Sequence, residues 1–160
     1  MVILLDLDGV LITTPSWRAV EIAPDGFFQF DARATRNLAT ILAETNAALV
    51  LTTSHRINYS LAEWRAFFTT RGLFPATIFK VNDRTALPPA GARAAEIAAW
   101  VAAQSPNTNY VVLDDDLSLH GLPLAIKSRR VSTKPLLGLD AEATQKALHI
   151  LRGNPTSLPL

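Results

Sequence analysis

Two aspartates, Asp6 and Asp8, stand at the end of an unbroken apolar run near the start of the chain. The run at 2–5 is short and soon reaches a glycine, as expected of a strand that is buried on both faces. If the strand continues through Leu7, both carboxylates point to the same side, because side chains alternate along a strand. Two desolvated carboxylates placed close together need a cation or a shared proton, so this pair is a candidate site for metal or acid–base chemistry.

Two further polar clusters end predicted strands. Taken alone, the first acidic pair is read more simply as a solvated turn, but three clusters at the same kind of position favour a common site. A strand predicted at 47–52 and another predicted at 110–113 lead directly into these two clusters. The residues of the clusters are Thr53, Ser54, His55, Arg56, Asp114, Asp115 and Asp116.

Carboxylates that converge at one edge of a sheet form an oxygen-rich pocket for a hard cation, and Mg²⁺ is the expected ion. A hydroxyl from Thr53 or Ser54 would bind an anion, and Arg93 at the start of a predicted helix would add a fixed positive charge. Arg56 and Lys80 are alternative sources of that charge. Together these groups suit phosphoryl transfer, in which one carboxylate can act as the nucleophile and a second as the acid and base.

The elements that must position these residues follow from hydrophobic periodicity. Helices are predicted to begin after the N-cap residues Asp31, Ser60 and Asp140, and another is predicted at 91–104. The alternation predicts an α/β fold, a three-layer Rossmann-like and mainly parallel sheet with helices on both faces. The strands are predicted at 2–5, 47–52, 76–81, 110–113 and 124–127.

The chain of 160 residues is long enough for a single domain, which we predict at residues 1–153. A turn signature at 24–26 lies between two extended stretches, so a small flap is predicted at about 15–31. Packing is expected of the flap's aromatic residues, with a substrate opening as the alternative. These residues are Trp17, Phe27, Phe28 and Phe30. Residues 154–160 are expected to form a loose tail, and no segment has room for a separate cap domain.

Composition excludes several classes of protein. Apolar residues make up 49% of the chain, which argues against disorder, and the net charge of +1 gives no electrostatic reason to expect nucleic acid, although a local basic patch remains compatible. The chain has no cysteine, so disulfides and thiolate zinc sites are excluded. No apolar run approaches the length of a membrane span and no basic leader precedes the first strand, so we expect a soluble cytoplasmic protein with no membrane partner.

These motifs together resemble the haloacid dehalogenase (HAD) superfamily of phosphatases. The resemblance rests on D-x-D-G-V at 6–10, the strand-terminal Thr53 and Ser54, and an acidic pair that ends a later strand, in the same order along the chain. It is closer still to a bacterial branch, the HAD domain of Swiss-army-knife RNA repair proteins and related short proteins. The further matching segments, at 51–56, 93–100, 113–116 and 138–139, extend the resemblance over nearly the whole chain.

The resemblance implies a role for each matching residue. Asp6 would be the nucleophile and a metal ligand. Asp8 would be the general acid and base, with its backbone carbonyl on the Mg²⁺. Thr53, or Ser54 if the strand ends one residue later, would bond the phosphoryl oxygens. The metal site would be completed by Asp114 or Asp115.

Two positions depart from the pattern of the family. Arg93 falls where the superfamily usually has lysine, and arginine presents a fork of N–H donors in place of a point charge. His55 stands where the closer branch commonly has tryptophan, and we expect it to pack or to contact the substrate. Asp116 is expected to be solvated or structural.

The expected function is therefore a Mg²⁺-dependent phosphatase that hydrolyses a phosphomonoester through a phosphorylated Asp6. HAD enzymes without a cap tend to act on bulky substrates, so the expected phosphate lies on a nucleic-acid end, a nucleotide or a protein. The alternative is a weak or inactive HAD-like binding or regulatory module, which the arginine at position 93 motivates and which would belong to an RNA-repair system. A phospho-acceptor domain of the receiver type fits poorly, because its acceptor follows the third strand.

Overall fold

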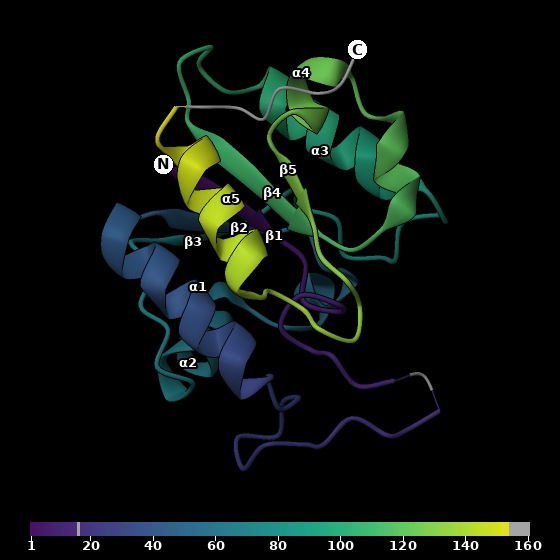
Figure 1. Cartoon of the computed structure of the whole chain (residues 1–160). Coiled ribbons are helices and arrows are strands. Elements are labelled where there is room, and N and C mark those ends of the chain that lie inside the picture. The colour runs from purple at the N-terminus through teal and green to yellow at the C-terminus, as the bar shows by residue number, and fades with distance from the viewer. Residues whose placement is uncertain (16, 154–160) are drawn as a thin grey trace.

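Five parallel strands form the centre of the structure, a computed structural model that describes residues 1–15 and 17–153 (Figure 1). Their order across the sheet is β3-β2-β1-β4-β5. The strands are β1 (Val2–Leu5), β2 (Ala48–Leu51), β3 (Ile78–Lys80), β4 (Tyr110–Asp114) and β5 (Arg130–Ser132). Since β1 and β4 lie inside the sheet and are covered on both faces, their sequences are almost continuously apolar.

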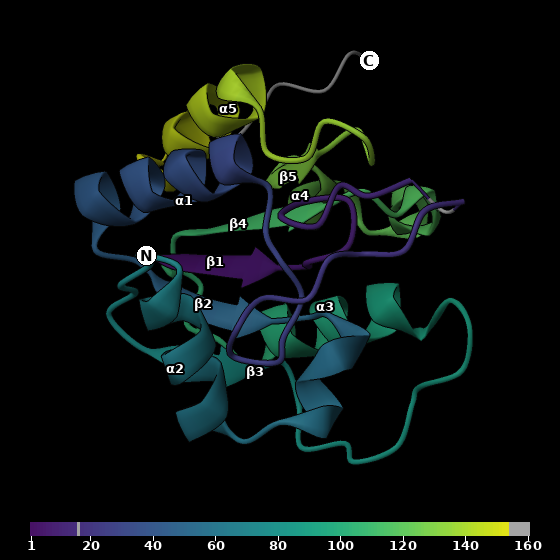
Figure 2. The ribbon, with the colours of Figure 1, turned by 90° about the horizontal axis from the view of Figure 1, so that it is seen from below.

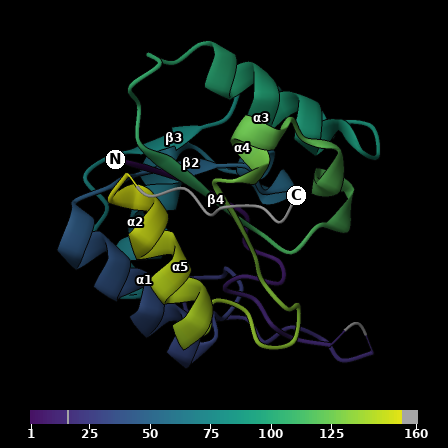
Figure 3. The same cartoon turned by 45° about the horizontal axis from the view of Figure 1, so that its top comes forward.

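Helices cover both faces of the sheet (Figure 3). Three of them share one apolar core with Ile3 and Leu5 of β1, and these are α1 (Ala32–Thr45), α2 (Leu61–Thr70) and α5 (Ala141–Leu151). The neighbouring Leu4 points to the other face, into a core with α3 (Ala92–Ala102) and the short α4 (Leu124–Lys127). Two 3₁₀ turns, η1 (Ser54–Asn58) and η2 (Leu117–Gly121), follow β2 and β4. The predicted three-layer α/β fold is confirmed.

The three central strands end at the same level. Leu5 of β1 is in register with Leu51 of β2 and with Leu113 of β4. The residues that come next are Asp6, Thr52 and Asp114. Because parallel strands run in one direction, these side chains emerge together at the carboxyl edge of the sheet. The register thus brings together residues from three well-separated parts of the chain.

The predicted helix starts are confirmed by their capping geometry. The side chain of Asp31 accepts a hydrogen bond from the Ala34 amide, and that of Asp140 accepts one from the Ala143 amide. Ser60 and Glu63 bond reciprocally to each other's backbone N–H, which is a complete capping box. These caps satisfy amides that the first turn of each helix leaves without a partner.

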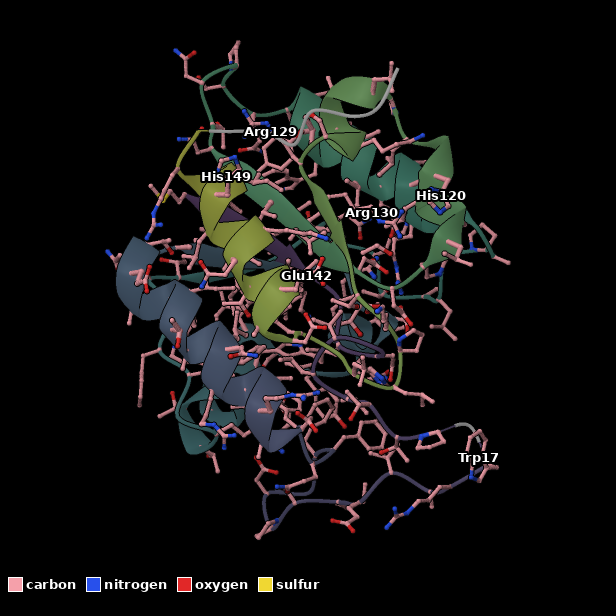
Figure 4. The ribbon with its side chains drawn as sticks, in the orientation of Figure 1. Trp17, His120, Arg129, Arg130, Glu142 and His149 are labelled. Atoms are coloured by element: carbon pink, nitrogen blue, oxygen red, sulfur yellow. The ribbon has the colours of Figure 1, made fainter. Side chains whose placement is uncertain are left out.

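One predicted strand is wrong. Residues Leu124–Lys127 form the helix α4, and the fifth strand lies further on, at Arg130–Ser132. A run of four residues is too short for its periodicity to separate a strand from a helical turn, and Pro123, which has no N–H to leave unpaired, suits a helix start. Arg130, the first residue of β5 and labelled in Figure 4, donates from Nη2 to the Asp116 carbonyl oxygen at 2.7 Å.

The flap, of which residues 15 and 17–31 are described, extends beyond the arrowheads of β1 and β4 (Figure 2). It contains the predicted hairpin, with an isolated antiparallel bridge between Ile22 and Phe28 around the turn at 24–26. Arg71, the C-cap residue of α2, binds this turn. Its Nη1 and Nη2 donate to Asp25 Oδ2 and Oδ1 at 2.6 and 3.1 Å. The turn of the hairpin is therefore fixed to the C-terminal end of α2.

The aromatic residues of the flap have two different environments. Phe27 and Phe30 are only 2% and 5% exposed, and Phe27 stacks on Phe67 with a centroid distance of 4.7 Å. Packing is thus confirmed for these two residues. It is wrong for Trp17, which is 81% exposed and projects from the flap (Figure 4).

Within the described residues, the segments on either side of Thr53 carry only the flap and elements of the sheet layers, so they add no separate cap domain. No helix anywhere in residues 1–15 and 17–153 is long and apolar enough to cross a bilayer. The tail predicted at 154–160 lies outside the described residues.

Candidate active site

Three carboxylates meet at the carboxyl edge of the sheet. Asp6 directly follows β1, Asp114 is the last residue of β4, and Asp115 comes next. Each offers an oxygen, and these oxygens all lie within 4.8 Å of one another. Asp6 and Asp114 are buried and Asp115 is half-buried. The predicted meeting of the first acidic motif with the distant one is therefore present in the fold.

A guanidinium lies between two of these carboxylates. Arg93, the second residue of α3, donates from Nη1 to Asp6 Oδ2 at 2.8 Å and to both carboxylate oxygens of Asp114 at 3.3 Å. The two alternative cations are engaged elsewhere. Lys80 Nζ donates to the Tyr59 carbonyl oxygen at 2.6 Å, and Arg56 pairs with a glutamate of α3. Arg93 is thus the predicted cation that contacts Asp6.

The cluster carries more negative than positive charge. Burial, together with the charge of Asp114, raises the pKa of Asp6 to about 7 although Arg93 opposes this shift. Burial also raises the pKa values of Asp114 and Asp115. When ionised, three carboxylates face one guanidinium, which leaves an excess of two negative charges that one divalent ion would balance.

The oxygen atoms also fit a metal. Asp6 Oδ1 is buried and has no hydrogen-bond partner among the described residues. A buried, unsatisfied carboxylate oxygen is costly unless it has a ligand, and carboxylate oxygens are the ligands that Mg²⁺ prefers. The residues at this edge are therefore suited to hold a hard divalent cation.

Asp8 lies apart from this cluster. The strand ends at Leu5, so Asp6 and Asp8 do not share one strand face as a longer strand would require. The chain instead turns sharply, with the amides of residues 10, 11 and 12 all donating to the Leu7 carbonyl oxygen. As a result Asp6 is buried, whereas the Asp8 side chain is 59% exposed and faces the solvent side of the site.

Two glycines allow close contacts around this turn. Gly9 has a φ of +74°, and a Cβ at this position would collide with the Asp115 carboxylate. Gly138 has a φ of +64°, and a Cβ there would collide with the Val10 carbonyl oxygen. The segment around Gly138 secures the turn, because Thr133 Oγ1 donates to the Gly9 carbonyl oxygen at 2.7 Å. The close packing of this segment on the turn that contains Gly9 thus explains the glycine at position 138.

The hydroxyls after β2 lie at the same edge. Thr53 is fully buried and its Oγ1 accepts a hydrogen bond from the His55 amide at 3.3 Å, which starts η1. Ser54 is partly exposed and lines a cavity of about 170 Å³ together with Arg93. Thr52 lines the same cavity, and its buried Oγ1 has no partner among the described residues. Sequence reasoning missed Thr52, which only the strand register places beside Asp6.

A buried ion pair supports the turn after β2. Arg56 is 1% exposed, and its Nη1 donates to the carbonyl oxygens of Thr52 and Thr53 at 3.2 and 3.1 Å. Its Nη2 donates to Glu96 Oε1 of α3 at 2.8 Å. Arg56 therefore holds the backbone of the hydroxyl-bearing turn. Sequence reasoning offered Arg56 as a source of charge for the substrate and gave no role to Glu96.

His55 joins the two halves of the site. Its Nε2 lies 3.0 Å from Asp8 Oδ2, and this hydrogen bond raises the pKa of the imidazole. The ring also packs edge-on against Phe27 and Phe28 of the flap. The expected packing role of His55 is confirmed, whereas its polar contact with Asp8 has no sequence signal, since 47 positions separate the two residues.

The comparisons with known proteins agree with this geometry. The family model described as "HAD domain in Swiss Army Knife RNA repair proteins" matches residues 2–144, which include every strand and all the site residues above. No match was found among curated proteins or among solved structures. Membership of a HAD family points to a hydrolase of the HAD type or a module related to one. The match covers most of the chain, which therefore belongs to the family of HAD domains found in Swiss Army Knife RNA repair proteins.

Proposed function

We propose that the protein is a Mg²⁺-dependent phosphatase that hydrolyses a phosphomonoester through a covalent phosphate on Asp6. The observation that carries this proposal is the buried Asp6 carboxylate at the end of β1, 2.8 Å from Arg93 Nη1 and within reach of two further carboxylates. Charge compensation and placement are what phosphoryl transfer needs from a protein. The HAD family match supports a hydrolase on independent grounds.

Mg²⁺ would be held by the carboxylates of Asp6, Asp114 and Asp115, together with the backbone carbonyl of Asp8. When bound, the ion supplies positive charge that offsets the charge of the phosphoryl oxygens. Arg93 would keep the Asp6 carboxylate in one orientation and supply further positive charge. The hydroxyl of Thr53 or Ser54 would donate to a phosphoryl oxygen.

The reaction has two halves. In the first, an Asp6 carboxylate oxygen attacks phosphorus, the bond from phosphorus to the leaving oxygen breaks, and the protonated Asp8 gives its proton to that oxygen. In the second, the Asp8 carboxylate takes a proton from water as the water oxygen attacks phosphorus. The bond between phosphorus and Asp6 then breaks, which releases inorganic phosphate and restores both carboxyl groups. The exposed position of Asp8 suits contact with a leaving group.

This proposal is tested with p-nitrophenyl phosphate and Mg²⁺. Turnover that disappears when a chelator is added and returns with Mg²⁺ is the expected result. The competing candidate is a binding or regulatory module without turnover, which is favoured by the contacts of Arg93 Nη1 with both Asp6 and Asp114. Chelator-sensitive turnover rejects that candidate, and an absence of turnover across a panel of phosphomonoesters supports it.

We expect Asp115→Asn to raise the Mg²⁺ concentration needed for half-maximal turnover by at least about tenfold, because one charged ligand is lost. The matched control is Asp116→Asn. The Asp116 side chain caps η2 by accepting from the Ser118 amide, and asparagine caps equally well. The measurement is a Mg²⁺ titration of turnover, together with the rise in Tm that Mg²⁺ causes in each variant. An equal shift in both variants contradicts the assignment of Asp115.

The substrate we propose is a phosphate at the end of a nucleic acid. The described residues place a small flap beside the site and no separate cap domain over it, so a large substrate can approach. Trp17 presents an exposed ring on the flap, with the exposed Arg18 beside it. Nucleic-acid bases stack on exposed aromatic rings, and arginine pairs with phosphates. The family's association with RNA repair proteins agrees with this substrate class.

We expect Trp17→Ala to lower kcat/KM for an oligoribonucleotide with a terminal phosphate by about tenfold, which is the loss of one stacking contact. Turnover of p-nitrophenyl phosphate is expected to stay unchanged, since it lacks the chain of nucleotides that would extend to Trp17. The control is Phe74→Ala, which removes a ring that is also exposed, at 69%. Phe74 lies before β3, on the amino side of the sheet and away from the carboxyl edge that carries the site. Equal effects of the two substitutions on the oligonucleotide would overturn the assignment of Trp17.

A further inference from the structure

We infer that His55 is a positioning residue for Asp8, whose carboxylate it orients toward the leaving group through an Nε2–H donor that the flap holds in place. This inference rests on the proposed function, because it assigns His55 a part in the proton transfer of that reaction. It goes beyond the residues that the HAD motifs mark, since His55 departs from the pattern of the family branch.

The side chain of Asp8 needs a partner to keep one orientation. Its side chain is 59% exposed and lies in the turn after β1. The hydrogen bond to His55 Nε2, at 3.0 Å, is the one side-chain hydrogen bond that Asp8 makes within the described residues. An acid that must meet a leaving oxygen works best from a fixed geometry, and an exposed carboxylate without a partner samples several rotamers.

The imidazole of His55 is itself fixed on several sides. The backbone amide of His55 donates to Thr53 Oγ1, which places the residue in η1. Its ring meets Phe27 at 6.0 Å and an interplanar angle of 87°, and Phe28 at 5.2 Å and 63°. Phe27 is buried and stacked on Phe67 of α2. The ring is therefore attached to the core through the flap, and only 22% of its side chain is exposed.

The two oxygens of the Asp8 carboxyl group have different roles in this arrangement. If Nε2–H donates to Oδ2, that oxygen is an acceptor, and the proton destined for the leaving group is left on Oδ1. The arrangement requires an N–H at the Nε2 position and does not require a charge on the ring. His55 touches Asp8 and the flap, so its effect on the reaction passes through Asp8.

The test compares two substrates that differ in their need for an acid. A p-nitrophenolate leaves without a proton, whereas an alkoxide leaves only when it is protonated, and general acid catalysis contributes about 10²–10⁴-fold. The quantity measured is kcat/KM, which reports the steps up to phosphorylation of Asp6. We expect His55→Phe, which keeps a ring but lacks the donor, to lower kcat/KM at least about tenfold for an alkyl phosphate and much less for p-nitrophenyl phosphate.

Two further variants make the test specific. His55→Gln carries an N–H donor near the position of Nε2 and is expected to restore most of the alkyl phosphate turnover. His55→Asn is too short to place a donor there and is expected to behave as His55→Phe does, which keeps the test valid if the phenylalanine variant misfolds. In an Asp8→Asn background, His55→Phe is expected to have no further effect that depends on the leaving group, because the two residues act as one unit.

Three results would overturn this inference while leaving the phosphatase intact. They are an equal loss with both substrates, the same selective loss in the Asp8→Asn background, or no recovery with His55→Gln. Each would reduce His55 to a structural contact between the flap and the turn after β1. The proposed function fails separately, when the unmodified protein shows no Mg²⁺-dependent turnover or when Asp6→Asn retains it.

Discussion

Asp6→Asn is expected to lower kcat for any phosphomonoester at least about 10³-fold, because the amide oxygen cannot form the acyl phosphate. Asparagine has nearly the same size as aspartate, so the packing around residue 6 is kept. The measurement is steady-state turnover, together with labelling of the unmodified protein by a ³²P-phosphomonoester under acid quench. Label should appear on the unmodified protein and be absent from the variant.

The same substitution has an informative effect on stability. The pKa of Asp6 is about 7 in the folded protein and 3.8 in the reference state, so the folded state favours the protonated form. The Asp6 carboxylate therefore lowers metal-free stability progressively as pH rises from about 4 to about 7, and the full loss persists at a constant level above that. At pH 8 without metal, Asp6→Asn should unfold at the same Tm as the unmodified protein or at a higher one.

Asp83→Asn is the matched control for both measurements, since Asp83 is an exposed carboxylate outside the acidic cluster. Its turnover and Tm should equal those of the unmodified protein. An Asp6→Asn variant that folds and turns over at the rate of the control would contradict a covalent mechanism through Asp6.

Glu96→Leu is expected to lower the free energy of unfolding by about 3–5 kcal/mol, because it leaves the buried charge of Arg56 unpaired. Arg56 and Glu96 expose only 1% and 7% of their side chains, and 2.8 Å separates Arg56 Nη2 from Glu96 Oε1. Nη1 of Arg56 donates to two backbone carbonyls of the turn after β2, so the guanidinium cannot move to solvent without breaking those contacts as well. Urea unfolding measures the change.

The matched control is Glu44→Leu. Glu44 pairs with Arg152 at 2.6 Å, but both side chains are largely exposed, at 42% and 56%. Loss of such a pair costs less than about 1 kcal/mol. The double variant Arg56→Met, Glu96→Leu removes the unpaired charge and is expected to regain part of the lost stability. If Glu96→Leu cost no more than Glu44→Leu, the buried pair would have no special role in the fold.

Local patterns in the sequence determined most of the elements. The apolar run at 2–5, soon followed by a glycine, predicted a buried strand, and Asp31, Ser60 with Glu63, and Asp140 carry their capping chemistry within a few residues. Where the local signal is short, as at 124–127, sequence reasoning chose the wrong element. The wrong expectation for Trp17 has a similar origin, because an aromatic residue is buried only if a partner surface lies opposite it.

The composition of the site was partly accessible in the same way. An acidic motif after the first strand and another after a later strand predict a meeting, because all parallel strands present their carboxyl ends at one edge. The sequence did not choose among Arg93, Arg56 and Lys80. That choice depends on where each crossover places its side chain, and the fold puts Arg93 on Asp6 while it buries Arg56 against Glu96.

By itself, the sequence determined the α/β class, the caps and that acidic motifs follow two of the strands, because each is set by residues near one another in the chain. Only the tertiary structure decided that β1 ends at Leu5, that Thr52 stands beside Asp6, and that His55 meets Asp8. Those features depend on strand register and on contacts between residues tens of positions apart. Such contacts form when the strands pair and the helices pack on both faces of the sheet, and no local pattern encodes them.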